Sequence, residues 1–250
     1  MGALHEGHLA LVDTAQRHAD AVAVSIFVNP LQFGPTEDLV RYPRTLEADL
    51  DALRARGVAY VFVPSAEEMY PAGHVTGVTT APHAALFEGA IRPGHFAGVL
   101  TVVNKLFHII QPDVAVFGQK DLQQLSLIRR MVRDLNIPIE IVDMPTVRDL
   151  DGVAMSSRNR YLSPDDRLRA ACMYVALCAI RKRFESGQRD GQQLLDTGRA
   201  ILTRDPHVAI DYLALVDPGD FSSVATAVAG AAAVLAVRLT GNRLLDNIIL

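Results

Sequence analysis

The sequence predicts an α/β protein in which a doubly wound parallel sheet is followed by a second, smaller α+β domain. Short apolar, β-branched segments alternate with helix-like segments through the first two thirds of the 250 residues, as in a parallel sheet covered by helices on both faces. After Pro145 this alternation stops. A helix start follows, with Ser163 as the N-cap and Pro164 at the first helical position. We therefore expect one domain over residues 1–146 and another over residues 147–250.

The spacing of apolar residues predicts the individual elements. Expected strands are residues 21–28, 58–63, 113–117, 139–142, 209–216 and 232–239. Expected helices are residues 45–56, 97–110, 121–135 and 192–204, with one more opening at Ser163. Residues 225–236 are rich in Ala and Val and fit either a helix or a strand. Polar residues follow two of the strands, at the edge where open parallel sheets bind ligands.

Composition excludes several classes of partner. The net charge of −4 and the pI of about 6.0 give no general attraction for nucleic acid or an anionic membrane. No apolar run reaches the roughly 18 residues of a spanning helix. The first residues lack the basic start and apolar stretch of a signal peptide. We expect a cytoplasmic protein that acts on small molecules.

Residues 5–8 read HEGH and place two histidines three positions apart. If a helix begins here, His5 and His8 share one face, and the helix start attracts phosphate. Taken alone, the pattern is more often two surface histidines at a helix start. A zinc-protease site is excluded, because its histidines stand four apart.

Two other polar segments are candidates for binding phosphate. Residues 118–121 (GQKD) put a lysine and an aspartate just past a buried strand, where a solvated loop with a capping aspartate is equally consistent. Residues 155–160 (MSSRNR) combine hydroxyl and guanidinium groups that can wrap a triphosphate, although an ordinary polar interdomain loop has the same composition. A P-loop is unlikely, because residues 89–95 carry His95 where it needs lysine.

Taken together, these segments resemble the nucleotidylyl-transferase superfamily and, within it, the pantothenate synthetase family. The resemblance rests on residues 1–8 (MGALHEGH), 27–33 (FVNPLQF), 42–45 (YPRT), 92–96 (RPGHF), 117–121 (FGQKD) and 155–159 (MSSRN), and it continues at residues 243–247 (RLLDN). All stand in the family's order over nearly the whole chain.

The resemblance implies a Rossmann-like first domain, a C-terminal lid domain and a role for each matched residue. The residues expected to stabilise the reacting phosphates are His5, His8, Lys120, Ser156, Ser157 and Arg158. Those expected to complete the ATP site are Met1, Gly118, Asp121, Val147 and Met155. Those expected to bind pantoate are Gln32, Gln124, Met1 and Phe33, with Asn29, Tyr42 and His95 as weaker candidates nearby. Asp49 is expected to help place Mg²⁺.

The implied reaction is ATP-dependent condensation of (R)-pantoate with β-alanine through a pantoyl-adenylate, in the biosynthesis of pantothenate and coenzyme A. A homodimer is also implied. The family carries a further strand before residue 1, so we expect the sheet of this chain to lack a central strand. Two alternatives stay open: a nucleotidylyl transferase with a phosphorylated acceptor, and an inactive nucleotide-binding relative.

Overall fold

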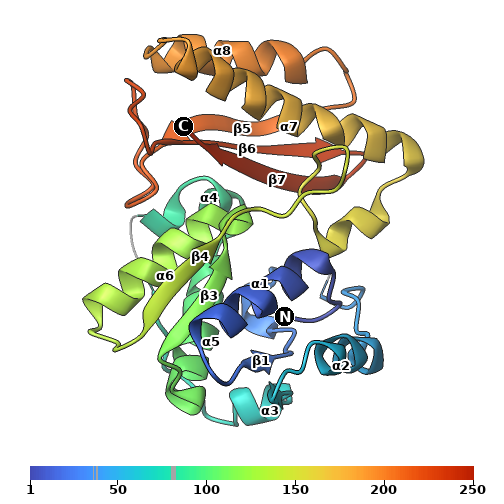
Figure 1. Cartoon of the computed structure of the whole chain (residues 1–250), viewed down its shortest axis with the longest axis vertical. Helices are drawn as coiled ribbons and strands as arrows, with labels where there is room; N and C mark the ends of the chain where they lie inside the picture. Colours follow the sequence, from blue (N-terminus) through green and yellow to red (C-terminus); the bar gives the residue numbers. More distant parts are fainter. Residues whose placement is uncertain (36, 38, 80–82) are drawn as a thin grey trace. The chain divides into compact units, whose positions relative to one another are not determined.

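The computed structural model describes residues 1–35, 37, 39–79 and 83–250 (Figure 1). The chain divides into two compact units. The first consists of Met1–Gly118 and Gln124–Met144, and the second of Gln119–Gln123 and Pro145–Leu250. The polypeptide therefore enters the second unit briefly, at residues 119–123, before it does so for good after Met144.

The first unit alternates helices with short parallel strands, as the hydrophobic spacing predicts. Its strands are β1 (Ala23–Ser25), β2 (Tyr60–Phe62), β3 (Val114–Gly118) and β4 (Glu140–Met144). Its helices are α1 (Glu6–His18), α2 (Leu46–Ala55), α3 (Ala66–Met69), α4 (Glu88–Ile91), α5 (His95–Ile110) and most of α6 (Leu122–Asp134), with 3₁₀ turns η1 (Pro30–Gln32) and η2 (His83–Ala85). The short helices α3 and α4 had no signal in the periodicity.

Parallel pairing confirms the α/β class, but the strands do not form one ladder. β1 pairs with β2, and β3 pairs with β4, as two separate two-stranded sheets. Among the described residues, no strand links β1 to β3. The Met1 carbonyl accepts a hydrogen bond from Phe27 N at 3.0 Å, so residue 1 lies beside the continuation of β1.

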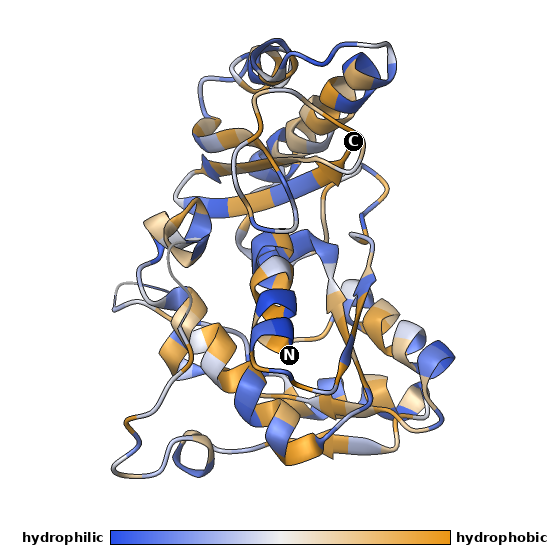
Figure 2. Ribbon diagram, turned by 90° about the vertical axis from the view of Figure 1, so that its left-hand side faces the viewer, coloured by the Kyte–Doolittle hydropathy of each residue, from blue (hydrophilic) through white to orange (hydrophobic). Residues whose placement is uncertain are grey.

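Two apolar clusters hold the first unit together. Leu9 and Val12 of α1 pack with Val24 and Ile26 around β1 and with Leu53 of α2. The second cluster joins α5 to α6 and includes Phe96, Leu100, Ile128 and Met131. Hydrophilic and hydrophobic residues are interspersed along the helices (Figure 2), as expected for helices that bury one face.

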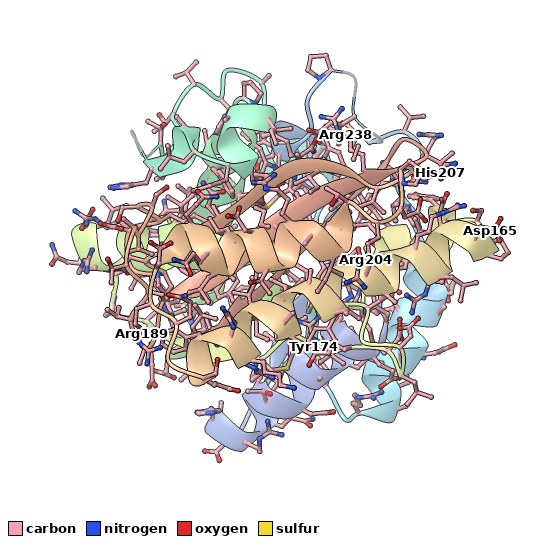
Figure 3. All side chains as sticks on the ribbon, turned by 90° about the horizontal axis from the view of Figure 1, so that it is seen from above. Asp165, Tyr174, Arg189, Arg204, His207 and Arg238 are labelled. Atoms are coloured by element: carbon pink, nitrogen blue, oxygen red, sulfur yellow. The ribbon has the colours of Figure 1, made fainter. Side chains whose placement is uncertain are left out.

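The second unit is an antiparallel sheet covered by two helices. The strands β5 (Ala209–Val216), β6 (Ala232–Leu239) and β7 (Asn242–Ile249) pair in sequence order. The helices α7 (Pro164–Glu185) and α8 (Gly191–Leu202) lie side by side over this sheet (Figures 1 and 3). The unit also contains the 3₁₀ turns η3 (Gln119–Asp121) and η4 (Ser157–Tyr161).

Some elements of this unit were predicted from the sequence and others were not. Ser163 caps α7 as expected, because its hydroxyl accepts from Asp166 N at 3.1 Å. The ambiguous residues 225–236 enter a strand only at Ala232, and the sequence analysis did not predict β7. Within the part of the chain that the structure describes, no helix has the length and apolar character needed to cross a membrane.

Candidate active site

The two histidines of the HEGH segment meet at the start of α1. His5 is the N-cap residue, with an extended backbone, and its carbonyl accepts hydrogen bonds from His8 N and Leu9 N at 2.8 and 3.1 Å. The centroids of the His5 and His8 rings are 4.0 Å apart. The imidazoles therefore lie together at the N-terminal end of a 13-residue helix, where backbone N–H groups and the helix dipole favour an anion.

Asp49 fastens the turn that precedes these histidines. Its side chain is buried, and its two oxygens accept hydrogen bonds from Ala3 N and Leu4 N at 2.9 and 2.8 Å. The Thr45 hydroxyl adds a third bond at 3.1 Å. Ala3 needs this support, because its φ of 49° lies in the left-handed region that residues other than glycine rarely adopt. The carboxylate thus sets the path of the chain into His5.

Gln32 is held through its backbone by two side chains from the RPGHF segment. Its carbonyl lies 2.8 Å from His95 Nδ1 and 3.3 Å from Arg92 Nη2. A carbonyl only accepts, so Nδ1 carries the imidazole proton, and His95 Nε2 accepts from Arg92 Nη1 at 3.0 Å. Arg92 is in turn paired with Glu37 at 2.6 Å. The weaker candidate His95 therefore positions Gln32.

The remaining predicted pantoate residues also belong to the first unit. Phe33 follows Gln32 directly and stacks edge-on against Tyr42, with centroids 5.6 Å apart. Met1 packs partly buried against the cluster around β1. Gln124 lies half-buried on α6. Gly118, which was predicted for the ATP site, ends β3 in the same unit.

Lys120 lies in the second unit, on a turn held by a residue from the far end of the chain. The side-chain amide of Asn247 donates to the carbonyls of Gln119 and Lys120, both at 2.9 Å. Lys120 Nζ lies 3.7 Å from Asp121. No role was predicted for Asn247 from the sequence, although the residue belongs to the matched segment at 243–247.

The other predicted nucleotide residues follow a hairpin in the same unit. Met155 N donates to the Val147 carbonyl at 3.0 Å, which pairs two residues expected at the ATP site. The MSSR segment then turns into η4, where the Ser156 hydroxyl accepts from Arg158 N at 3.3 Å. Ser157 is buried, so Ser156 and Arg158 are the more accessible members of this turn.

A buried ion pair joins this hairpin to β7. Arg148 donates to both oxygens of Asp246, at 2.6 and 2.9 Å, and its guanidinium lies 4.0 Å from the centroid of the Tyr174 ring. Burial raises the pKa of Asp246, and the charge of Arg148 offsets part of that effect. Sequence reasoning missed this pair, because the two residues are 98 positions apart.

The structure brings the predicted residues together in sets. His5, His8 and Asp49 form one set, Gln32 and Phe33 a second, Lys120 and Asp121 a third, and Val147, Met155 and residues 156–158 a fourth. Across residues 1–35, 37, 39–79 and 83–250, no three His, Cys, Asp or Glu side chains are grouped as metal ligands.

Comparison with known proteins decides what these sets belong to. Residues 1–249 match the family model described as pantoate-beta-alanine ligase. The chain belongs to the pantoate–β-alanine ligase family. The match covers both units, and with them every residue expected at the ATP and pantoate sites.

Relatives in this ligase family match along the whole chain. A pantothenate synthetase from Acidobacterium capsulatum is 51% identical over 250 residues, which is 100% of this chain and 84% of the relative. One from Mycolicibacterium smegmatis is 54% identical over 249 residues, 99% of this chain and 78% of the relative.

Solved structures of the ligase family share the fold. The crystal structure of a pantothenate synthetase from Thermus thermophilus aligns with a TM-score of 0.97 at 50% identity, covering 100% of this chain and 90% of that one. A pantoate-beta-alanine ligase from Francisella tularensis, complexed with beta-gamma ATP and beta-alanine, aligns at 0.80 with 33% identity, covering 100% and 87%. The mixed α/β class with a smaller second sheet is therefore the fold of this family.

Proposed function

We propose that the chain condenses (R)-pantoate with β-alanine at the expense of ATP, releasing AMP and pyrophosphate and forming pantothenate. The observation that carries this proposal is the family match over residues 1–249. The paired imidazoles at the start of α1 are the local geometry that supports it. The product is the precursor from which coenzyme A is built.

In the first step, a pantoate carboxylate oxygen attacks the α-phosphorus of ATP, and the bond from that phosphorus to the bridging oxygen of pyrophosphate breaks. Pantoate is already ionised at neutral pH, so this step needs no general base. The barrier is the approach of two anions, which fixed donors and positive charge lower. We assign this task to His5, His8, Lys120, Ser156, Ser157 and Arg158, and the rest of the ATP site to Met1, Gly118, Asp121, Val147 and Met155.

In the second step, the neutral amine of β-alanine attacks the acyl carbon of the pantoyl-adenylate. The C–N bond forms, the C–O bond to AMP breaks, and the nitrogen loses a proton. The pantoate part stays in a pocket that we assign to Gln32, Gln124, Met1 and Phe33. Uncharged amides suit a substrate with two hydroxyls, because a site that hydrogen-bonds hydroxyls discriminates against analogues without them.

Magnesium would bind here chiefly through the phosphates of the nucleotide, near the negative charge of Asp49. Mg²⁺ prefers oxygen ligands and is usually held by one or two carboxylates together with substrate phosphates. Both oxygens of Asp49 already accept backbone hydrogen bonds, so Asp49 can offer an ion little beyond its negative charge. When bound, the ion neutralises phosphate charge, while Asp49 shapes the turn that carries His5.

We also propose a cytoplasmic homodimer whose ligands are small molecules. The acidic net charge of −4 gives no overall attraction for nucleic acid. Light scattering of the purified protein would test the oligomeric state, and a mass of one chain would contradict the dimer.

The test is to follow AMP and pyrophosphate release from ATP with pantoate and β-alanine supplied separately. Pyrophosphate should appear when pantoate is added, and pantothenate only after β-alanine follows. Turnover that is equal without pantoate, or that requires a phosphorylated acceptor, would support another nucleotidylyl transferase instead. Binding of ATP with no turnover of pantoate would support the inactive relative.

A further inference from the structure

Asn29 is a buried residue whose side-chain amide bonds Gln32, a residue of the proposed pantoate pocket. Only 2% of its surface is exposed. Its oxygen Oδ1 accepts from Leu31 N at 3.3 Å and from the Tyr70 hydroxyl at 2.8 Å. Its nitrogen Nδ2 donates to the Gly98 carbonyl at 3.1 Å and to Gln32 Oε1 at 3.2 Å. An amide side chain offers two donors and two main acceptor positions, and all four are occupied.

Two backbone groups fix the direction of these hydrogen bonds. A backbone N–H can only donate and a backbone carbonyl can only accept, so Leu31 and Gly98 determine which end of the Asn29 amide is oxygen. Tyr70 must then donate to that oxygen. Gln32 must present its own oxygen to Asn29 Nδ2, which leaves the –NH₂ end of the Gln32 amide for a ligand.

Tyr70 is suited to act as a permanent donor in this chain of hydrogen bonds. Burial raises the pKa of its hydroxyl to about 12, so the proton stays on Tyr70 at any working pH. Its bond to Asn29 is the shortest of the four. The same hydroxyl therefore holds the side chain on which the orientation of Gln32 depends.

We infer that Tyr70 is a positioning residue for substrate recognition: acting through Asn29, it keeps the Gln32 amide turned so that Gln32 binds pantoate as a hydrogen-bond donor. Gln32 then recognises an acceptor oxygen of the substrate, either a carboxylate oxygen or a hydroxyl lone pair. This inference rests on the proposed function, in which Gln32 lines the pantoate pocket. The Gln32 carbonyl is held separately by Arg92 and His95, so the backbone at Gln32 keeps two anchors that do not depend on Tyr70.

The first test is Tyr70→Phe, which removes only the hydroxyl, with Tyr60→Phe as the matched control. Tyr60 lies on β2 with 66% of its surface exposed. Steady-state kinetics of Tyr70→Phe should show KM for pantoate raised about 3- to 10-fold, as for the loss of one uncharged hydrogen bond. KM for ATP should change less than about 2-fold on the same reasoning. The Tyr60→Phe enzyme should match the wild type. An unchanged KM for pantoate in Tyr70→Phe would overturn the inference.

A double-mutant cycle separates positioning from general support of the fold. Gln32→Ala alone should raise KM for pantoate, and adding Tyr70→Phe should then change it by less than about 2-fold, because the side chain through which Tyr70 acts is gone. The same factor for Tyr70→Phe in both backgrounds would show a structural role only and overturn the inference.

The donor polarity of Gln32 has its own test in Gln32→Glu. A glutamate can accept from Asn29 with one oxygen, but it turns the other, negatively charged, toward an anionic substrate. Pantoate use should therefore fall further than in Gln32→Ala. A Gln32→Glu enzyme with near-normal KM for pantoate would show that Gln32 acts as an acceptor and would overturn the inference.

The same measurements separate failure of this inference from failure of the proposed function. A wild type without pantoate-dependent AMP release overturns both. A wild type that turns over pantoate and loses affinity on Gln32→Ala, but gives an additive cycle, overturns only the positioning role of Tyr70.

Discussion

Arg148→Met should strongly destabilise the C-terminal unit. Arg148 donates to both oxygens of Asp246 and to the carbonyls of Gly152 and Asn247, at distances from 2.6 to 3.2 Å. Only 2% of the Asp246 side chain is exposed. Methionine keeps much of the apolar packing but leaves this carboxylate without its counter-charge. Breaking a buried pair in this way costs about 3–5 kcal/mol, a large share of a typical domain stability of about 5–15 kcal/mol.

The stability lost in Arg148→Met should increase as the pH rises. Burial already raises the pKa of Asp246, and removal of Arg148 should raise it further. A group whose pKa is raised in the folded state destabilises the protein when it must ionise. The defect relative to the wild type should therefore be smallest below the ordinary aspartate pKa of about 3.9 and grow as the pH rises above it.

Urea denaturation followed by circular dichroism, at acidic and neutral pH, measures both effects. The informative control is the double variant Arg148→Met/Asp246→Leu, which replaces the ion pair by apolar side chains and should recover most of the lost stability. A loss below about 1 kcal/mol in the single variant, the level of an exposed pair, would refute the reasoning. So would a double variant as unstable as the single one.

Three further changes test the site. Lys120→Ala should slow single-turnover AMP formation by at least ~100-fold, since losing one preorganised electrostatic contact costs about 2.7–4 kcal/mol; a normal rate in a folded variant would make Lys120 a solvated loop residue. Asn247→Ala removes the donor to the Gln119 and Lys120 carbonyls and should lower the same rate about 5- to 150-fold, from two bonds of about 0.5–1.5 kcal/mol each, whereas an unchanged rate would deny that Asn247 positions the turn. Gly98→Ala would place a Cβ 2.2 Å from the Leu31 carbonyl oxygen and should destabilise the protein by about 1–3 kcal/mol, so an unaltered thermal melt would contradict the tight approach.

The strands of the second unit were predicted from sequence where their apolar runs are unbroken. Ala209–Val216 and Ala232–Leu239 are strands with the bounds that their apolar runs predict. β7 was not predicted, because Asp246 and Asn247 interrupt its apolar pattern, although both are buried in the structure. Each side chain bonds a partner distant in sequence, Arg148 for Asp246 and the Gln119 and Lys120 carbonyls for Asn247, and no local pattern predicts these contacts.

The candidate site likewise contains residues that the sequence predicted and residues that it did not. The order of the motifs was enough to nominate His5, Lys120 and Gln32, because their chemistry lies in short contiguous segments. Asn29 was nominated as a weaker candidate, but its partner Tyr70 was not, since the two residues are 41 positions apart and meet only in the folded chain. Asp49 was nominated for a metal, and the structure adds its backbone-anchoring bonds to Ala3 and Leu4, which the sequence analysis did not anticipate.

Residues 119–123 belong to the second unit although the flanking residues belong to the first. This limits where the chain can be truncated or joined to a relative in a chimera. A chain cut after residue 146 would retain Lys120 but lose Asn247, whose amide holds the backbone of that turn. A chimera joined at the same place would pair the turn of one parent with β7 of the other. Because Asn247 donates to backbone carbonyls, which every sequence at residues 119–120 provides, a recombinant between relatives should tolerate exchange of residues 119–123 as long as it keeps asparagine at position 247.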